Sequence, residues 1–184
     1  MDYSELDAEI RRLVGAATES GVRAFGEETV VRLVRPERFR DADEGELTAD
    51  AWAALANACA NVLTLGAAGL GRELATIDDG ILADDDLDTG VLAVVQALEH
   101  WQGYLEQNGR EEVYELAIRS IEDVDHEVSA ALGDFLATPE MAAEYERIRR
   151  LLDPDPNGKH HGPTRSARAS VPSECDVPDD HSPA

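Results

Sequence analysis

Apolar side chains recur at three- and four-residue steps in two neighbouring segments, which the dipeptide Asn108-Gly109 separates. This spacing places the apolar side chains on one stripe of a helix. In the first segment the stripe comprises Leu87, Val91, Val94, Leu98, Trp101 and Leu105. In the second segment it comprises Val113, Leu116, Ala117, Ile121, Val124, Val128 and Leu132. The sequence therefore predicts two antiparallel amphipathic helices joined by a short turn.

The same period predicts two helices nearer the N-terminus. Ser4 resembles a helix start, and the helix that follows should end near Gly21. A second apolar stripe runs over residues 22–34, and Pro36 should stop it because a proline disfavours helix in the residue before it. Residues 37–47 are highly charged and show no period, so we expect a surface loop there.

Further helix signals lie on either side of the central pair. Thr48 is a capping residue for an alanine-rich helix in which Trp52 should face inward. The glycines that follow Leu65 predict a bend and then a shorter helix that ends near Ile77. The run Thr138-Pro139-Glu140 has a cap, a proline at the first helical position and an acid in the first turn. It predicts the last helix of the chain.

These elements define the expected domain organisation. We predict an all-α bundle of six or seven helices over residues 1–152. From residue 153 onward the composition changes, because six of the eight prolines lie there with serines and few large apolar residues. Residues 153–184 are therefore expected to form a disordered tail.

The charge of the chain narrows the classes of partner. Thirty-nine acidic residues against 16 basic ones give a formal net charge of -23. Such a field repels nucleic acid and anionic membranes, and it favours a basic protein partner. The plain alternative is that the charge only keeps the protein soluble. The two cysteines, Cys59 and Cys175, lie far apart and the N-terminus has no apolar segment, so we expect a reducing cytoplasmic location.

These observations favour an acidic protein-binding module of the immunity or antitoxin class, which would neutralise a basic protein such as a toxin. The candidate contact residues are Asp78, Asp79, Asp84, Asp85, Asp86, Asp88, Glu111, Glu115 and Glu122. A homo-oligomeric structural module is a further alternative. No catalytic constellation and no cofactor motif is expected.

A metal-binding protein or enzyme is the competing class. The acidic run fails as a calcium loop, because Thr89 and Val95 stand where that loop needs glycine and glutamate. A carboxylate and histidine site would use His100, Asp123 and His126, which form only half of the constellation of di-metal bundles. We therefore expect both histidines to be partly exposed helix residues.

The order of these features resembles the YjaG-like helical proteins of domain-of-unknown-function family 416. The resemblance is carried by Ile77 to Asp79, Asp84 to Leu87, Gly90-Val91, Ser120-Ile121 with Val124, and Pro139-Glu140 with Glu144 before Leu151-Leu152. A looser match covers Arg32 to Pro36 and Trp52. Gly80-Ile81 departs from the proline-bearing turn of that pattern. The resemblance implies an all-helical fold and brings no established activity.

Overall fold

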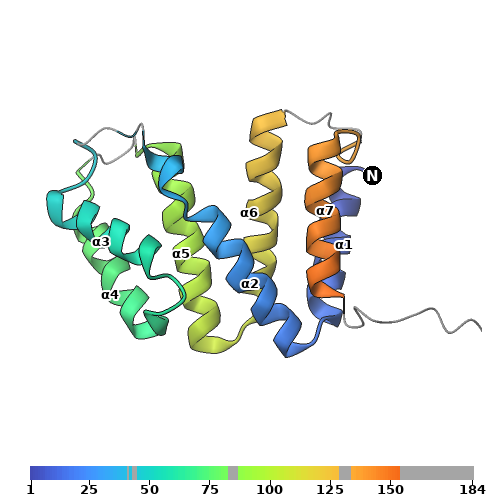
Figure 1. Cartoon of the computed structure of the whole chain (residues 1–184), viewed down its shortest axis with the longest axis horizontal. Helices are drawn as coiled ribbons and strands as arrows, with labels where there is room; N and C mark the ends of the chain where they lie inside the picture. Colours follow the sequence, from blue (N-terminus) through green and yellow to red (C-terminus); the bar gives the residue numbers. More distant parts are fainter. Residues whose placement is uncertain (41, 43–44, 83–86, 129–133, 154–184) are drawn as a thin grey trace, which may run out of the picture.

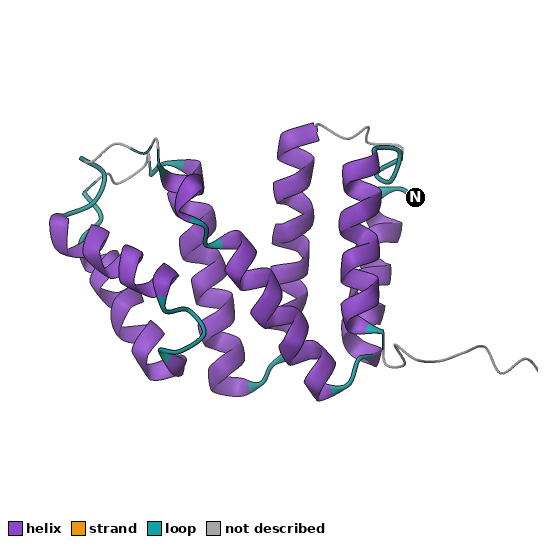
Figure 2. Ribbon diagram, in the orientation of Figure 1, coloured by secondary structure: helices purple, strands orange, loops and turns teal. Residues whose placement is uncertain are grey.

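The computed structural model of the chain describes residues 1–40, 42, 45–82, 87–128 and 134–153 (Figures 1 and 2). Its elements are α1 (Tyr3–Ala16), α2 (Glu19–Leu33), the 3-10 helix η1 (Pro36–Phe39), α3 (Ala49–Ala60), α4 (Gly66–Asp79), α5 (Thr89–Gln107), α6 (Arg110–Val128) and α7 (Pro139–Leu152). Within these residues an isolated bridge between Leu47 and Ile81 is the only β-pairing. The all-α prediction is confirmed.

Helix α6 lies at the centre of the bundle. It packs on α1, α2, α5 and α7, while α3 and α4 pack on each other and mainly on α5 (Figure 1). Because four neighbours surround α6, it buries Tyr114 and Ile118 in addition to the first four members of the predicted stripe, whereas Val124 and Val128 are half-buried. The spacing of apolar residues predicted one buried face of this helix and did not predict the second.

The predicted helix pair is confirmed. The Val91, Val94, Leu98 and Trp101 side chains of α5 are buried, and Asn108 ends the helix in the left-handed conformation with φ of 52°. Asparagine tolerates this conformation better than most residues, which lets the chain reverse into α6. Leu132, the last residue of the predicted stripe in the second helix, lies outside the described residues.

Two predicted boundaries at the N-terminus are wrong. Helix α1 is capped by Asp2, not Ser4, because the Asp2 and Glu5 side chains form a reciprocal capping box. It ends at Ala16, well before Gly21, because Thr18 already caps α2 by accepting a hydrogen bond from the Gly21 amide. The two predicted helices are present, and the Thr18 cap places the boundary between them a few residues earlier than predicted.

The expected surface loop over residues 37–47 is also partly wrong. Pro36 opens the 3-10 helix η1, and Leu47 at the other end is buried and bridged to Ile81.

The helix after the glycines that follow Leu65 is not the shorter one that was predicted, because α4 has 14 residues and α3 has 12. Trp52 is half-buried and lies beside the Phe39 ring, with centroids 6.2 Å apart. No helix of the described residues has the length and apolar character needed to cross a membrane.

Candidate functional site

The predicted acidic contact residues fall in two separate regions. Asp78 and Asp79 are exposed at the end of α4, which packs on α3 and α5. Glu111, Glu115 and Glu122 lie on α6, on the other side of α5 (Figure 1). Residues 84–86, which complete the predicted set, lie outside the described residues. The fold therefore does not place the described members of the set on one continuous surface.

Asp88 serves the fold. Its carboxylate caps α5 by accepting hydrogen bonds from the Gly90 and Val91 amides at 2.8 and 3.1 Å. Its own amide donates to Glu46 at 2.8 Å. Because its side chain is engaged in this cap, Asp88 is a poor candidate for a partner contact.

The α6 carboxylates meet the side chains of α1, and we call this surface the α1/α6 face. It comprises Tyr3, Asp7 and Arg11 of α1 with Glu111, Glu115, Arg119 and Glu122 of α6. Arg11 donates to both Glu111 oxygens at 2.8 and 3.0 Å, and Arg119 donates to Glu122 at 2.9 Å. Neither Asp7 nor Glu115 has an ion pair within the described residues.

Burial and nearby carboxylates together raise the pKa values of Tyr3 on this face and of the buried Tyr114 beneath it. Burial raises the pKa of Tyr3, and the neighbouring carboxylates of Glu122, Asp7 and Glu115 raise it further. The Tyr114 hydroxyl donates to Asp7, and burial followed by this hydrogen bond raises its pKa to about 12. The α1/α6 face is therefore a region where negative charge accumulates beside an exposed aromatic ring.

The residues of the competing metal site are not brought together. His100 pairs through Nδ1 with the Glu112 carboxylate at 2.8 Å, whereas Asp123 forms an ion pair with Arg38. His126 is exposed in the last turn of α6. In the part of the chain that the structure describes, no group of three or more His, Cys, Asp or Glu side chains is placed to hold a metal ion.

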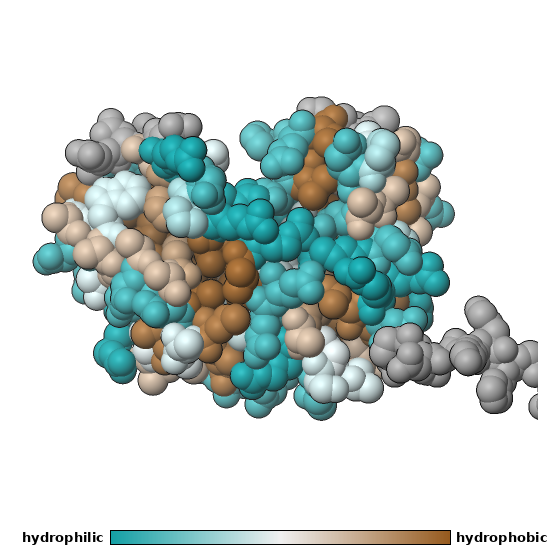
Figure 3. Space-filling view, viewed as in Figure 1, coloured by the Kyte–Doolittle hydropathy of each residue, from teal (hydrophilic) through white to brown (hydrophobic). Residues whose placement is uncertain are grey.

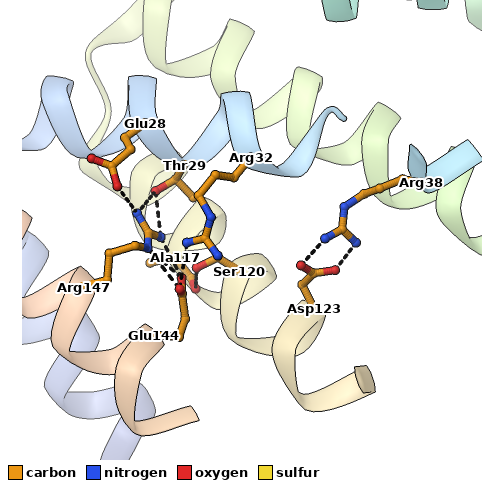
Figure 4. Close-up of polar contacts among 9 residues, drawn as sticks. All are labelled: Glu28, Thr29, Arg32, Arg38, Ala117, Ser120, Asp123, Glu144 and Arg147. Carbon is orange, nitrogen blue, oxygen red and sulfur yellow. Dashed lines mark hydrogen bonds and ion pairs between the residues drawn. The ribbon is translucent and has the colours of Figure 1, made fainter. Parts of the chain in front are cut away.

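A buried ionic network joins α2 to α7 (Figure 4). The Glu144 side chain is 4% exposed and accepts hydrogen bonds from Arg32 at 2.7 Å and from Arg147 at 2.7 and 3.0 Å. Arg147 also donates to the Thr29 hydroxyl at 3.2 Å and to Glu28 at 3.2 Å. One carboxylate thus holds two guanidinium groups from two helices.

The pKa of Glu144 reflects a balance that favours the charged form. Desolvation raises this pKa, but the hydrogen bonds from Arg147 and Arg32 together hold it below its ordinary value. A buried carboxylate that stays ionised needs such partners, because an unpaired buried charge is costly. The network therefore fixes how α7 sits on α2.

A second ion pair spans the neighbouring cleft. Arg38 of η1 binds Asp123 of α6 through both guanidinium Nη atoms (Figure 4). The backbone of η1 lies against Gly90 so closely that a Cβ there would meet the Arg38 carbonyl. Together these contacts define a cleft of about 190 Å³, lined by Arg32, Leu33, Arg35, Arg38, Ser120, Asp123, Val124 and Glu127.

A larger open hollow lies beside η1 and α3. Its volume is about 660 Å³, and it is lined by Pro36, Phe39, Arg40, Ala42, Leu47, Ala49 and Trp52.

Cys59, the cysteine within the described residues, packs against the core, and burial raises its pKa to about 12. A thiol with so high a pKa is a poor nucleophile near neutral pH.

Neither the network nor the cleft was predicted from the sequence. Of the members of the network, Glu144 was named only through the family resemblance, and no role was predicted for Arg147. Arg32 and Glu144 are 112 residues apart, so no local spacing reveals their pairing. One feature of the sequence could have indicated a buried role for Glu144. At helical spacing it falls between Met141 and Ile148, on the side of α7 that is buried.

Comparisons with models of protein families, with curated proteins and with solved structures give no match to this chain. The resemblance to the YjaG-like proteins therefore stays a prediction.

Proposed function

We propose that this chain is an acidic protein-binding module of the immunity or antitoxin class, acting in a reducing cytoplasm. Its contact surface in this proposal is the α1/α6 face, and its partner is a basic protein. The module acts by covering a cationic surface of that partner and carries out no reaction itself.

The observation that carries the proposal is the use that the fold makes of its arginines. Most of them are already paired with carboxylates of the chain itself. The paired set is Arg11, Arg12, Arg23, Arg32, Arg38, Arg40, Arg110, Arg119, Arg147 and Arg149. Within the described residues, only Arg35, Arg72 and Arg150 have no ion pair. The acidic surplus is therefore left for an external cation to neutralise.

The α1/α6 face is the part of this surplus best suited to a partner. Tyr3 is exposed and packs its ring against Phe135, with centroids 5.4 Å apart, so it offers a fixed aromatic surface. Glu115 and Asp7 beside it have no arginine of their own within the described residues. Aromatic rings next to unpaired charges of one sign suit an interface with a basic protein.

The region around Asp78 and Asp79 is a matched comparison. Both carboxylates are exposed and unpaired within the described residues, so their neutralisation changes the net charge by as much as that of Glu115 and Glu122. Comparing partner binding by a double variant at Glu115 and Glu122 with binding by a double variant at Asp78 and Asp79 therefore separates a specific contact from the general field of the protein.

The test is capture from extracts of the organism that encodes the chain. Immobilised wild-type protein, Glu115→Gln/Glu122→Gln and Asp78→Asn/Asp79→Asn are compared at low and high salt. We expect the wild type and the α4 variant to retain a basic protein at low salt, and the α1/α6 variant to lose most of it. Recovery of no basic protein at either ionic strength, or equal loss with both variants, contradicts the proposal.

A further inference from the structure

The cleft between the end of α2, η1 and the second half of α6 holds two charged side chains that form no ion pair within the part of the chain that the structure describes. Figure 3 shows the surface indented above α2, between the start of α5 and the end of α6. The lining is mostly polar and charged, with Leu33 and Val124 as its large apolar members. The indentation is thus a polar site in a bundle whose interior is otherwise mainly apolar.

Two of the three arginines that line the cleft are already neutralised. Arg32 donates to Glu144 at 2.7 Å, and Arg38 pairs with Asp123. Arg35 and Glu127 line the same cleft, and neither has an ion pair within the described residues. Arg35 follows α2 and Glu127 lies in the last turn of α6, so the cation and the anion come from the two walls.

These charges select the class of ligand. A simple anion would meet the carboxylates of Asp123 and Glu127, and the -23 charge of the chain would repel it. A simple cation would meet three guanidinium groups. A zwitterion carries no net charge, so the overall field does not repel it, and each of its ends meets an opposite charge.

We propose that the cleft binds a small zwitterion of the amino-acid type. Its carboxylate accepts hydrogen bonds from the Arg35 guanidinium, and its ammonium group donates to the Glu127 carboxylate. Leu33 and Val124 contact its carbon atoms. The site goes beyond the proposed docking function, because it lies away from the α1/α6 face and uses none of its residues.

The fold holds the walls of this cleft in place. The Arg38 and Asp123 ion pair spans the cleft between η1 and α6, and the Gly90 contact fixes the η1 backbone on α5. Ser120 at the cleft is itself held, because its hydroxyl donates to the Ala117 carbonyl at 2.9 Å. A preformed site loses less free energy to ordering when its ligand binds.

The test is a titration of the full-length, isotopically labelled chain with glycine, followed by amide chemical shifts at constant ionic strength. Acetate and methylammonium, which each carry one of the two charges, are titrated in parallel. Arg35→Gln and Glu127→Gln each remove one proposed contact. Arg40→Gln and Glu37→Gln remove the same charges from an exposed pair on and beside η1 that lies outside the cleft.

We expect saturable shifts with glycine, and binding about tenfold weaker with acetate, with methylammonium and in both cleft variants, since each loses one charge-assisted hydrogen bond. The two control variants should keep the glycine affinity. Arg35 and Glu127 are exposed, so their variants should fold, which circular dichroism verifies. Absence of saturable glycine binding, acetate binding as tight as glycine binding, or equal weakening in the control variants would overturn the proposal.

Discussion

The α1/α6 face and the interface of α2, α6 and α7 use the same two side-chain types in opposite ways. On the face, Arg11 and Glu111 pair with both side chains more than half exposed. In the interface, Glu144 is 4% exposed and Arg147 12% exposed. Solvent screens the first pair and leaves it little effect on folding, whereas the second holds two helices together. The burial of a charged side chain, and not the number of charged residues, decides whether the charge stabilises the fold or remains free for a partner.

Removing the Glu144 charge should have the largest effect on the free energy of unfolding. Glu144→Gln leaves Arg32 and Arg147 beside each other with no carboxylate between them, which should cost about 3–5 kcal/mol. Urea unfolding measures this cost. Glu146→Gln, two residues on and in an exposed pair with Arg149, should cost less than about 1 kcal/mol. Equal costs would remove the contrast between the two regions.

Acid should weaken the interface before it weakens the apolar core. The pKa of Glu144 lies below its ordinary value of 4.5 in the folded chain, so its stabilising effect is present above that value. The effect is lost as the pH falls from 4.5 through the lowered pKa. The difference in unfolding free energy between wild type and Glu144→Gln should therefore be constant near neutral pH and shrink in this acidic window. A difference that grows on acidification contradicts the assignment.

A substitution that disturbs the close approach of η1 to α5 should have a smaller effect on the free energy of unfolding. A methyl group at residue 90 would meet the Arg38 carbonyl, so Gly90→Ala should destabilise the fold by about 1–3 kcal/mol. Gly15→Ala is the control, because no atom lies within 4 Å of its added Cβ. Thermal unfolding should show a loss for the first variant and no loss for the second. Equal behaviour would mean that η1 is not held tightly against α5.

The smallest expected change in the free energy of unfolding comes from substitutions at the end of α4. Asp78 and Asp79 place negative charge at the negative end of a helix dipole, so each asparagine substitution should stabilise the chain by about 0.3–1 kcal/mol. Urea unfolding at low salt checks this, and the gain should fall as salt is added. Destabilisation by Asp78→Asn/Asp79→Asn would show that these carboxylates are part of the fold after all.

Elements with strong local signals could be predicted from the sequence. The caps at Thr48 and Thr138 and the short turn at Asn108-Gly109 all depend on residues within a few positions, and the structure confirms each of them. The start of α1 was misplaced because Ser4 and Asp2 compete as caps only two residues apart, and only Asp2 gains the reciprocal bond with Glu5.

The site depends on contacts that the sequence does not display. The second buried face of α6 exists because a distant part of the chain covers it, as Tyr114 shows by lying against Asp7 and Arg11 of α1. The pairing of Arg38 with Asp123 joins residues 85 positions apart, and neither residue lies in a recognisable motif for such a pair. Composition correctly indicated a large acidic surplus, but it could not show which carboxylates the arginines would neutralise.

The central claim is that the α1/α6 face docks a basic protein, and the rate of association with the captured partner tests it most directly. Electrostatic steering makes this rate sensitive to charges at the contact and to salt. We predict that Glu115→Gln/Glu122→Gln slows association several-fold more than Asp78→Asn/Asp79→Asn at low salt, with the difference vanishing at high salt. Equal rates for the two variants at low salt would contradict the claim.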